Sequence, residues 1–268
     1  MTTLNENSFK KYCDFIYSET GISINPNKKQ LLQMKLNKAM NKNNIKSYDE
    51  YFSLISNNTS TADFQKFVNY ITTNTTQFFR ENNHFKFIKE NMNYILENNP
   101  RIMKDKEIRI WSAGCSTGQE PVTLSIILKE CFNNEINLRI LATDINTKVL
   151  KKAISGEYLD TDCSSLPREY MLKYFDKIDN VYKVKKEILS NIKYRQFNLT
   201  NKFNFKKGFD IIFCRNVMIY FNNASQEKLI NKFYQHIVPG GLLFIGHSES
   251  LINKKHAFKN IGPSIYIK

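Results

Sequence analysis

The chain has 268 residues, room for one large domain or for a small and a medium one, and its 41% apolar residues can fill a sizeable core. This composition excludes a disordered or fibrous protein. No apolar run approaches the ~20 residues needed to cross a bilayer, and the first ten residues lack the apolar stretch of a secretory signal, so a cytosolic protein is expected.

The formal net charge of +14 is compatible with an acidic partner such as nucleic acid, an anionic membrane or an acidic protein surface. Plain composition is an equal alternative, because 32 of the 39 basic residues are Lys and the chain is rich in Asn. The charge is uneven, since residues 1–48 hold eight Lys against three acids. The five cysteines are scattered and never spaced as C-x-x-C, which is typical of free thiols and indicates neither disulfides nor a zinc site.

From residue 5 to about 98, apolar side chains recur at helical spacing and predict an all-α region. The signals of five helices are, in chain order, the stripe Phe9–Ile16 that stops near Gly21, the cap Asn25 followed by Pro26, the capping box Ser47–Glu50, the apolar face Phe64–Ile71, and a segment from about Asn83 to Glu97. The second helix carries Leu31, Leu32, Met34, Leu36 and Met40 on its expected apolar stripe. The segment NTTQFFRE (74–81) looks like an ordinary helix start.

Beyond residue 106, short β-rich runs alternate with helical segments and predict a largely parallel sheet covered by helices. The strand candidates are IRIWS, LRILATD, IKYRQFNL, FDIIFCRN, GLLFIGH and SIYIK, and the helical ones Pro121–Phe132, Thr147–Ser155 and Ala224–His236. Residues 156–190 break this rhythm and predict a small insertion. We therefore expect an all-helical domain (1–80), a helical connector (81–106) and an α/β domain (107–268).

A turn of small residues follows the first predicted strand, in the segment IRIWSAGCSTGQEP. Small residues such as Gly114 and Gly118 allow a ligand to approach the backbone closely, with the amino terminus of a helix behind it. The glycines are four apart, so G-x-G-x-x-G is absent, and no Gly-Lys-Ser/Thr of a P-loop follows. Alone, this turn is only a weak sign of a nucleoside site.

Polar residues follow two further strands at the same carboxyl edge. Asp144 ends LRILATD, where a carboxylate can accept hydrogen bonds from ribose hydroxyls, although capping of the helix that starts near Asn146 is an alternative use. Arg215 and Asn216 follow the predicted strand FDIIFC, and they are expected at the crevice in which open α/β sheets bind ligands. Together these positions favour a nucleoside.

Five segments, in order and at matching spacing, resemble those of chemotaxis receptor methyltransferases of the CheR type: NTTQFFRE (74–81), RIWSAGCSTGQEP (109–121), ATDI (142–145), FCRNVMIYF (213–221) and PGGLLFIGHSES (239–250). The resemblance implies a Rossmann-like class I methyltransferase domain with a small inserted β-subdomain, preceded by an all-α domain. It also implies an enzyme that uses S-adenosylmethionine, releases S-adenosylhomocysteine and forms methyl esters on glutamates of chemoreceptors.

The resemblance also implies the site residues. Cofactor contacts fall on Asn74, Thr76, Arg80, Gly114, Glu120, Asp144, Asn198, Leu199, Asn216 and Val217, and catalytic positions on Arg80 and Tyr220. Asp144 suits the ribose and Asn198 the adenine edge. Glu120 could neutralise the ammonium or the sulfonium of S-adenosylmethionine, or it could only complement the dipole of the helix that follows. No metal is expected, since the four histidines show no ligand spacing.

The expected chemistry needs no general base, because a glutamate with a reference pKa of ~4.3 is already a carboxylate at neutral pH. Our hypothesis is that Arg80 aims the substrate carboxylate while Tyr220 lines the transfer channel and helps to exclude water. The basic first 48 residues, with Lys28, Lys29, Lys35 and Lys38, offer electrostatic docking for the acidic helices of a receptor.

The expected partners are therefore the cytoplasmic acidic helices of chemoreceptors, with no nucleic acid, no direct membrane insertion and a monomeric enzyme. Tethering by a receptor peptide on the insertion is not predicted, because the loop FDKIDN is short and lacks glycine. A nucleic-acid methyltransferase is disfavoured by CRNVMIY in place of an N-P-P-Y motif, and a serine hydrolase by Ser250 where G-x-S-x-G needs Gly. A non-catalytic adaptor that binds S-adenosylmethionine is the remaining alternative.

Overall fold

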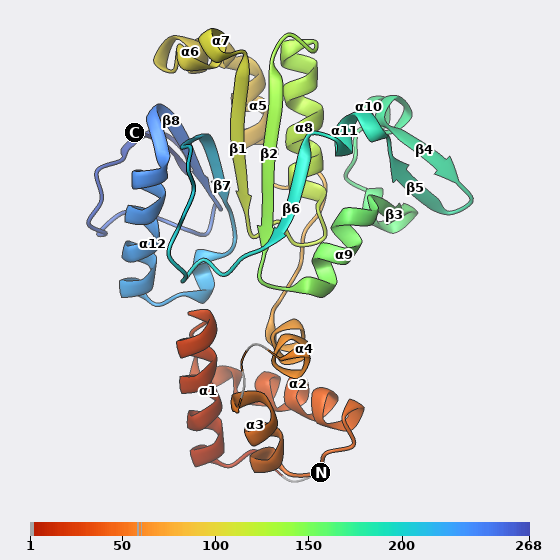
Figure 1. Cartoon of the computed structure of the whole chain (residues 1–268), viewed down its shortest axis with the longest axis vertical. Coiled ribbons are helices and arrows are strands. Elements are labelled where there is room, and N and C mark those ends of the chain that lie inside the picture. Colours follow the sequence, from red (N-terminus) through yellow and green to blue (C-terminus); the bar gives the residue numbers. More distant parts are fainter. Residues whose placement is uncertain (1–2, 58, 60) are drawn as a thin grey trace.

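The computed structural model describes residues 3–57, 59 and 61–268, and divides into a smaller helical lobe and a larger lobe built on a sheet (Figure 1). The helical lobe contains α1 (Glu6–Thr20), the 3-10 turn η1 (Pro26–Lys28), α2 (Lys29–Lys42), α3 (Tyr48–Ser56) and α4 (Ala62–Ile71). The predicted caps are confirmed: Asn25 accepts from the N–H of Asn27, and Ser47 from that of Glu50. The lobe has its own apolar core, centred on Tyr12, Leu36 and Phe67.

Two expectations for the helical part are wrong. Leu31 and Met34 were expected on the apolar stripe of α2, but their side chains are 45% and 68% exposed, because only Leu32, Leu36, Ala39 and Met40 face the core. The single helix predicted from 83 to 97 is two short helices, α5 (Asn83–Glu90) and α6 (Met92–Asn98), and a third, α7 (Arg101–Asp105), follows them. The first break falls at Asn91, whose φ of −113° and ψ of 26° leave the helical region and let α6 turn toward β8 while α5 packs on α8.

The larger lobe is built on a seven-stranded sheet in the order β6-β2-β1-β7-β8-β10-β9. Five strands are parallel: β1 (Glu107–Ala113), β2 (Asn137–Asp144), β6 (Ile192–Gln196), β7 (Phe209–Cys214) and β8 (Ile237–Ile245). The last two, β9 (Lys259–Gly262) and β10 (Ile265–Ile267), are antiparallel. The sequence did not predict β9, an edge strand whose side chains are exposed or half-buried.

Alternate residues of the central strands enter different apolar cores, one on each face of the sheet. Ile110 and Phe213 belong to the core shared with α5 and α8 (Gln119–Phe132), whereas Trp111 and Ile212 belong to the core shared with α12 (Asn223–His236). All six residues of β7 are buried, as expected for a strand covered on both faces. The helix α9 (Thr147–Ser155) follows β2.

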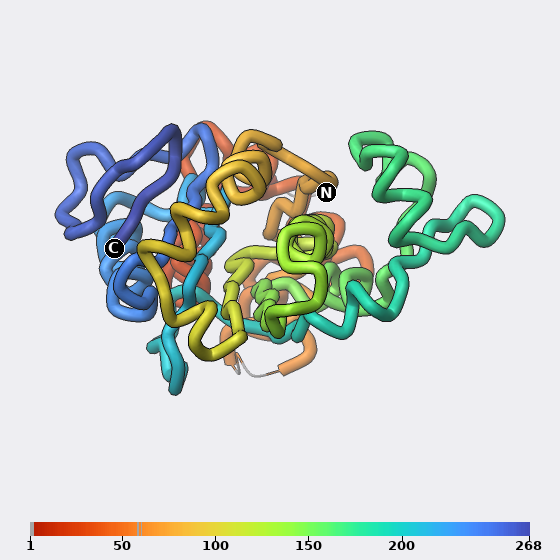
Figure 2. The backbone as a smooth tube through the Cα atoms, turned by 90° about the horizontal axis from the view of Figure 1, so that it is seen from above, coloured from red at the N-terminus to blue at the C-terminus, as the bar shows by residue number. Residues whose placement is uncertain are grey.

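The insertion forms a separate antiparallel sheet in the order β3-β5-β4, as the predicted fold class requires. Its elements are β3 (Glu157–Leu159), η2 (Asp160–Cys163), α10 (Arg168–Tyr174), β4 (Phe175–Ile178), β5 (Val181–Val184) and α11 (Lys186–Leu189). Figure 2 shows it projecting from the body on the side away from the C-terminus. In the described part of the chain, no helix is long and apolar enough to cross a membrane.

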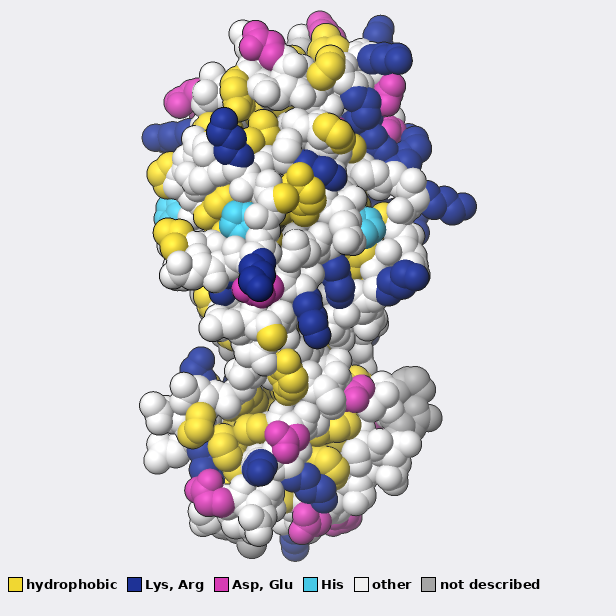
Figure 3. Space-filling view, turned by 90° about the vertical axis from the view of Figure 1, so that its left-hand side faces the viewer, with side chains coloured by type: hydrophobic (Ala, Val, Ile, Leu, Met, Phe, Trp, Pro, Cys, Tyr) yellow, Lys and Arg dark blue, Asp and Glu magenta, His cyan; other side chains and the backbone are white. Residues whose placement is uncertain are grey.

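The helical lobe lies against the carboxyl edge of the sheet, and the space-filling view shows a narrower waist between the two lobes (Figure 3). On one side of this waist Ile22 bridges Phe221, and the N–H of Ser23 donates to the carbonyl of Tyr220 at 2.7 Å. On the other side Asn146 donates to the hydroxyl of Thr72 at 2.7 Å. The lobes are therefore joined by hydrogen bonds on both sides of the sheet edge.

Candidate active site

A pocket opens at this junction, at the carboxyl ends of β1, β2 and β7. The structure brings every site residue expected from the sequence to its lining: Asn74, Thr76, Arg80, Gly114, Glu120, Asp144, Asn198, Leu199, Asn216, Val217 and Tyr220. The opposite wall comes from the helical lobe, where Ile22, Leu31 and Lys35 line it. The pocket thus combines segments that are far apart in the sequence.

The glycine turn after β1 forms the floor of the pocket. Gly114 has a φ of +96°, and a Cβ built on it would lie 2.4 Å from Cγ2 of Val217, so no larger residue fits. The next turn residue, Ser116, donates its N–H to Oδ2 of Asp144 at 2.9 Å and its hydroxyl to the carbonyl of Asn74 at 2.9 Å. These bonds join the ends of β1 and β2 to the segment that leaves the helical lobe.

Asp144 faces the pocket from the end of β2. Its other oxygen accepts from the N–H of Asn146 at 2.9 Å, but α9 is capped by Asn146, which accepts from Lys148 and Val149. Helix capping is therefore not the role of Asp144. Burial raises the pKa of its carboxyl, while the backbone N–H donors of Asn146 and Ser116 oppose this. The carboxylate keeps lone pairs for further donors, as a ribose contact requires.

Glu120 lies in the first turn of α8 with only 13% of its side chain exposed. It accepts from the hydroxyl of Ser112 at 2.7 Å and from Nη1 of Arg215 at 3.3 Å. Burial raises the pKa of Glu120, and the nearby guanidinium of Arg215 partly reverses this. A buried ion pair therefore underlies the pocket floor, in addition to any favourable interaction with the helix dipole.

The segment after α4 looks like a helix start in the sequence, but it contains no helix, and α5 begins at Asn83 as expected. Residues 72–77 are irregular, and residues 78–82 form a turn before α5. A tertiary bond from the hydroxyl of Ser116 to the carbonyl of Asn74 holds the irregular segment against the sheet. Arg80 donates Nη1 to the carbonyl of Thr75 at 2.8 Å and makes no ion pair among the described residues, although its charge partly opposes the rise that burial causes in the pKa of Glu120.

Asn198 has a use that the sequence did not predict. Its Nδ2 donates to the carbonyl of Glu19 at 2.7 Å, and its Oδ1 accepts from the N–H and hydroxyl of Thr200. The amide side chain thus ties the segment after β6 to α1. One N–H of its Nδ2 has no partner in these bonds and stays available to an adenine edge.

The loop after β7 is organised by Glu249, a residue that sequence reasoning missed. Its carboxylate, in a side chain buried to 8% exposure, accepts the N–H groups of Gly246, Asn216, Val217 and Ile219 at 2.6, 2.9, 2.9 and 3.2 Å. Asn216 has a left-handed φ of 58°, and these bonds hold it there. No local sequence pattern predicts the contacts of Glu249 with Asn216, Val217 and Ile219, because these residues lie 30 to 33 positions away in the chain.

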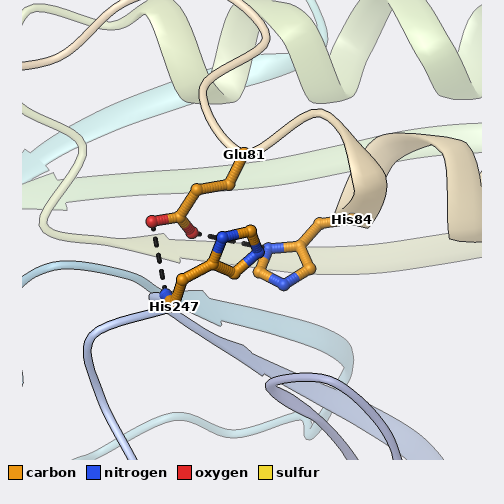
Figure 4. Close-up of side chains that lie close together, drawn as sticks. All are labelled: Glu81, His84 and His247. Carbon is orange, nitrogen blue, oxygen red and sulfur yellow. Dashed lines mark hydrogen bonds and ion pairs between the residues drawn. The ribbon is translucent and has the colours of Figure 1, made fainter.

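Glu81, His84 and His247 converge beside the pocket (Figure 4). The Glu81 carboxylate is already used: Oε2 accepts from Arg215 at 3.0 and 3.2 Å, and Oε1 accepts from Nδ2 of Asn216 at 3.2 Å and the N–H of His247 at 3.3 Å. Burial lowers the pKa of His84 to about 4, so its ring is neutral at pH 7. Both carboxylate oxygens of Glu81 already accept hydrogen bonds, and the positive guanidinium of Arg215 lies beside them. The three residues therefore suit a polar network that joins chain segments, not a metal centre.

A parallel sheet with a glycine turn after β1, an acid at the end of β2 and a pocket between them is the arrangement of a nucleoside-binding α/β domain. Two family models match the chain: "CheR methyltransferase, SAM binding domain" over residues 74–267 and "CheR methyltransferase, all-alpha domain" over residues 7–72. The chain belongs to the CheR methyltransferase family. Its cofactor is S-adenosylmethionine, and the resemblance in the sequence is confirmed.

Two curated relatives are similar over nearly the full chain. The chemotaxis protein methyltransferase of Borreliella burgdorferi is 34% identical, over 99% of this chain and 95% of the relative. The chemotaxis protein methyltransferase of Salmonella typhimurium is 32% identical, over 98% of this chain and 90% of the relative. The family membership and these relatives favour a catalytic protein over the non-catalytic adaptor that the sequence left open.

The residues of the pocket fit S-adenosylmethionine. Asp144 offers carboxylate oxygens to a ribose, and the Gly114 turn lets a ligand approach the backbone closely. The positively charged sulfonium and ammonium would be near Glu120, and Leu199 and Val217 give apolar contact. These assignments come from the position and chemistry of the side chains in one pocket.

Proposed function

We propose that this chemotaxis methyltransferase methylates glutamate side chains of chemoreceptors, forming methyl esters. The observation that carries the proposal is Arg80. It is a cation on the pocket wall that makes no ion pair among the described residues, and it lies in the lining that also includes Asp144 and Tyr220. Burial raises the pKa of Glu120 in the same lining, and the charge of Arg80 partly opposes this rise. A carboxylate substrate is the chemical class that such an arginine suits.

The protein has little proton chemistry to perform in this reaction. A glutamate of ordinary pKa, ~4.3, is ionised at neutral pH and attacks without a general base. S-adenosylmethionine, when bound, supplies the electrophilic methyl group on a positively charged sulfur. The residues of this chain must orient the carboxylate, exclude water and keep the nucleophile in line.

Arg80 is suited to aim a carboxylate without gripping it. One N–H of its Nη1 donates to the carbonyl of Thr75, which fixes one edge of the guanidinium and leaves its other N–H groups for a substrate carboxylate. A one-sided contact leaves the attacking oxygen free and nucleophilic. Tyr220, on the loop held by Glu249, lines the same pocket and would shield the reacting groups from water.

Docking of the receptor is proposed on α2, with a corrected set of lysines. Lys28 and Lys38 are exposed, and the exposed Leu31 and Met34 lie between them. Lys35, expected among the docking lysines, instead donates to the carbonyl of Ile71 at 2.7 Å. Lys29 is paired with Glu6. A surface with apolar and basic side chains suits an amphipathic acidic helix.

On the face in Figure 3, Lys and Arg side chains are scattered over the lobes and interspersed with acids. The docking proposal therefore rests on the residues of α2 and on Lys28, not on the net charge of +14.

The test is transfer of labelled methyl groups from S-adenosylmethionine to membranes that contain chemoreceptors. Alkali-labile label on the receptor supports the proposal, because methyl esters hydrolyse in base whereas methylated amines do not. Arg80→Ala should lose turnover far more than cofactor affinity, measured by calorimetry. The control Arg139→Ala removes an arginine that is 64% exposed at the other end of the sheet. Alkali-stable label, or Arg80→Ala with normal turnover, would contradict the proposal.

A further inference from the structure

The backbone around Arg80 is held in an unusual conformation. Phe79 and Glu81, its two neighbours, have φ values of +54° and +52°. For residues other than glycine this left-handed region costs roughly 1–2 kcal/mol each. Such a conformation persists only where the surroundings over-determine it. The contacts that impose it therefore decide where Arg80 points.

On the amino-terminal side, aromatic packing holds the chain. The ring of Phe79 stacks on Tyr170 of the insertion with centroids 5.5 Å apart and an angle of 4°. Phe78 packs edge-on against Tyr158 at 4.9 Å, and its carbonyl accepts from the hydroxyl of Ser165 at 2.7 Å. These contacts fix the residues before Arg80 but do not reach Arg80 itself.

On the carboxyl-terminal side, Arg215 holds both Arg80 and Glu81. Its Nη2 donates to the main-chain carbonyl of Arg80 and, at 3.0 Å, to Oε2 of Glu81, which also accepts from Nε at 3.2 Å. Its Nη1 donates to Glu120 at 3.3 Å. One guanidinium thus links the backbone of Arg80 to the carboxylates of Glu81 and Glu120.

The surroundings of Arg215 keep this arrangement rigid. Its side chain is 2% exposed, and its guanidinium lies over the rings of Phe85 and Phe213, 5.4 and 5.7 Å from their centroids. Burial alone would raise the pKa of Glu81, but the charge and hydrogen bonds of Arg215 lower it below its ordinary value. The pair is therefore ionised at neutral pH.

We propose that Arg215 and Glu81 are positioning residues that hold the main chain of Arg80 in the left-handed turn from which its side chain reaches the substrate. The inference rests on the proposed function of Arg80 and extends it to two residues that act through the main chain of Arg80. Lysine cannot replace Arg215, because a single ammonium lacks the planar fork that binds a carbonyl and two carboxylates at once.

The test is a double-mutant cycle on single-turnover methyl transfer with Arg215→Lys, Glu81→Gln and Arg80→Ala. Each positioning variant should lower the transfer rate by about 10- to 100-fold, because a displacement near 1 Å at a reacting centre has that effect. The KM for the receptor should stay unchanged, since docking uses α2. In the Arg80→Ala background, Arg215→Lys and Glu81→Gln should have almost no further effect on the rate.

The matched control is Arg101→Lys. Arg101 also pairs with a buried acid, Asp210, but at the opposite end of the sheet, so its loss should lower stability without lowering the transfer rate. If circular dichroism shows that Arg215→Lys does not fold, the test is made with Glu81→Gln, which has nearly the same shape as the wild type. A normal rate in a folded positioning variant, or losses that add fully to that of Arg80→Ala, would overturn the inference. A normal rate in Arg80→Ala alone would instead refute the proposed function.

Discussion

Replacing Glu249 by glutamine tests whether one buried carboxylate organises the loop that carries Asn216, Val217 and Tyr220. The carboxylate accepts four backbone N–H groups at 2.6 to 3.2 Å. Glutamine has almost the same shape but only one acceptor oxygen, which can serve two donors. The two remaining N–H groups would then face an amide nitrogen that cannot accept.

The magnitude follows from these two lost acceptors. A buried donor left without a partner costs about 1–3 kcal/mol, so two cost about 2–6 kcal/mol. Part of this cost is offset, because the neutral amide of glutamine is cheaper to bury than a carboxylate. Burial raises the pKa of Glu249, which shows that its charge is costly to bury. We expect a net loss near the lower end, about 2 kcal/mol in the free energy of unfolding.

Urea denaturation of Glu249→Gln and of the exposed control Glu97→Gln measures this loss. Calorimetry with S-adenosylmethionine should also show weaker binding in Glu249→Gln, because the loop lines the pocket. Ordinary surface substitutions change the free energy of unfolding by up to about 0.5 kcal/mol. A free energy of unfolding for Glu249→Gln within about 0.5 kcal/mol of that of the control would refute the role given to Glu249.

Three further outcomes are expected. Gly114→Ala should weaken cofactor binding at least about tenfold by calorimetry, because a φ of +96° and a contact of 2.4 Å leave no room for a Cβ; Gly262→Ala, with nothing nearer than 3.7 Å, should bind normally. Reversing Lys28 and Lys38 to Glu should raise the KM for receptor membranes, and an unchanged KM at low salt would exclude α2 as the docking surface. Since the folded pKa of Glu81 is lowered, its stabilising contribution is present above the unfolded pKa of ~4.3 and is lost as the pH falls through the folded value. The stability gap between the wild type and Glu81→Gln should therefore narrow in acid, and a gap that stays constant in urea titrations from about pH 6 to 3 would contradict this.

Features with a local physical cause were predictable from the sequence. Asn25 and Ser47 cap helices because their short side chains reach the first free N–H groups of the helix that follows. The apolar run of β7 marks a strand buried on both faces. Where the signal lies within a few residues, the fold follows directly from the sequence.

Features that depend on distant partners were not predictable in this way. The segment 72–77 is irregular and is bound by Ser116 and Asn146, and nothing within NTTQFFRE distinguishes this from a helix start. The same holds for Glu249, and for Arg215, whose partner Glu81 is 134 residues away. Gly114, Asp144 and Asn216 were found from the ends of the predicted strands, and the other pocket residues through the family resemblance. The groups that hold them in place needed coordinates.

Lys35 joins the proposed docking helix to the segment that enters the pocket. Its amine donates to the carbonyl of Ile71 at 2.7 Å and, more weakly, to that of Thr72, at the end of α4 where the irregular segment begins. The proposed docking helix α2 is thereby bonded to the segment that leads to Arg80. A receptor helix on α2 and a glutamate at Arg80 would then share one rigid support, so that binding energy gained far from the methyl group helps to align the reacting oxygen.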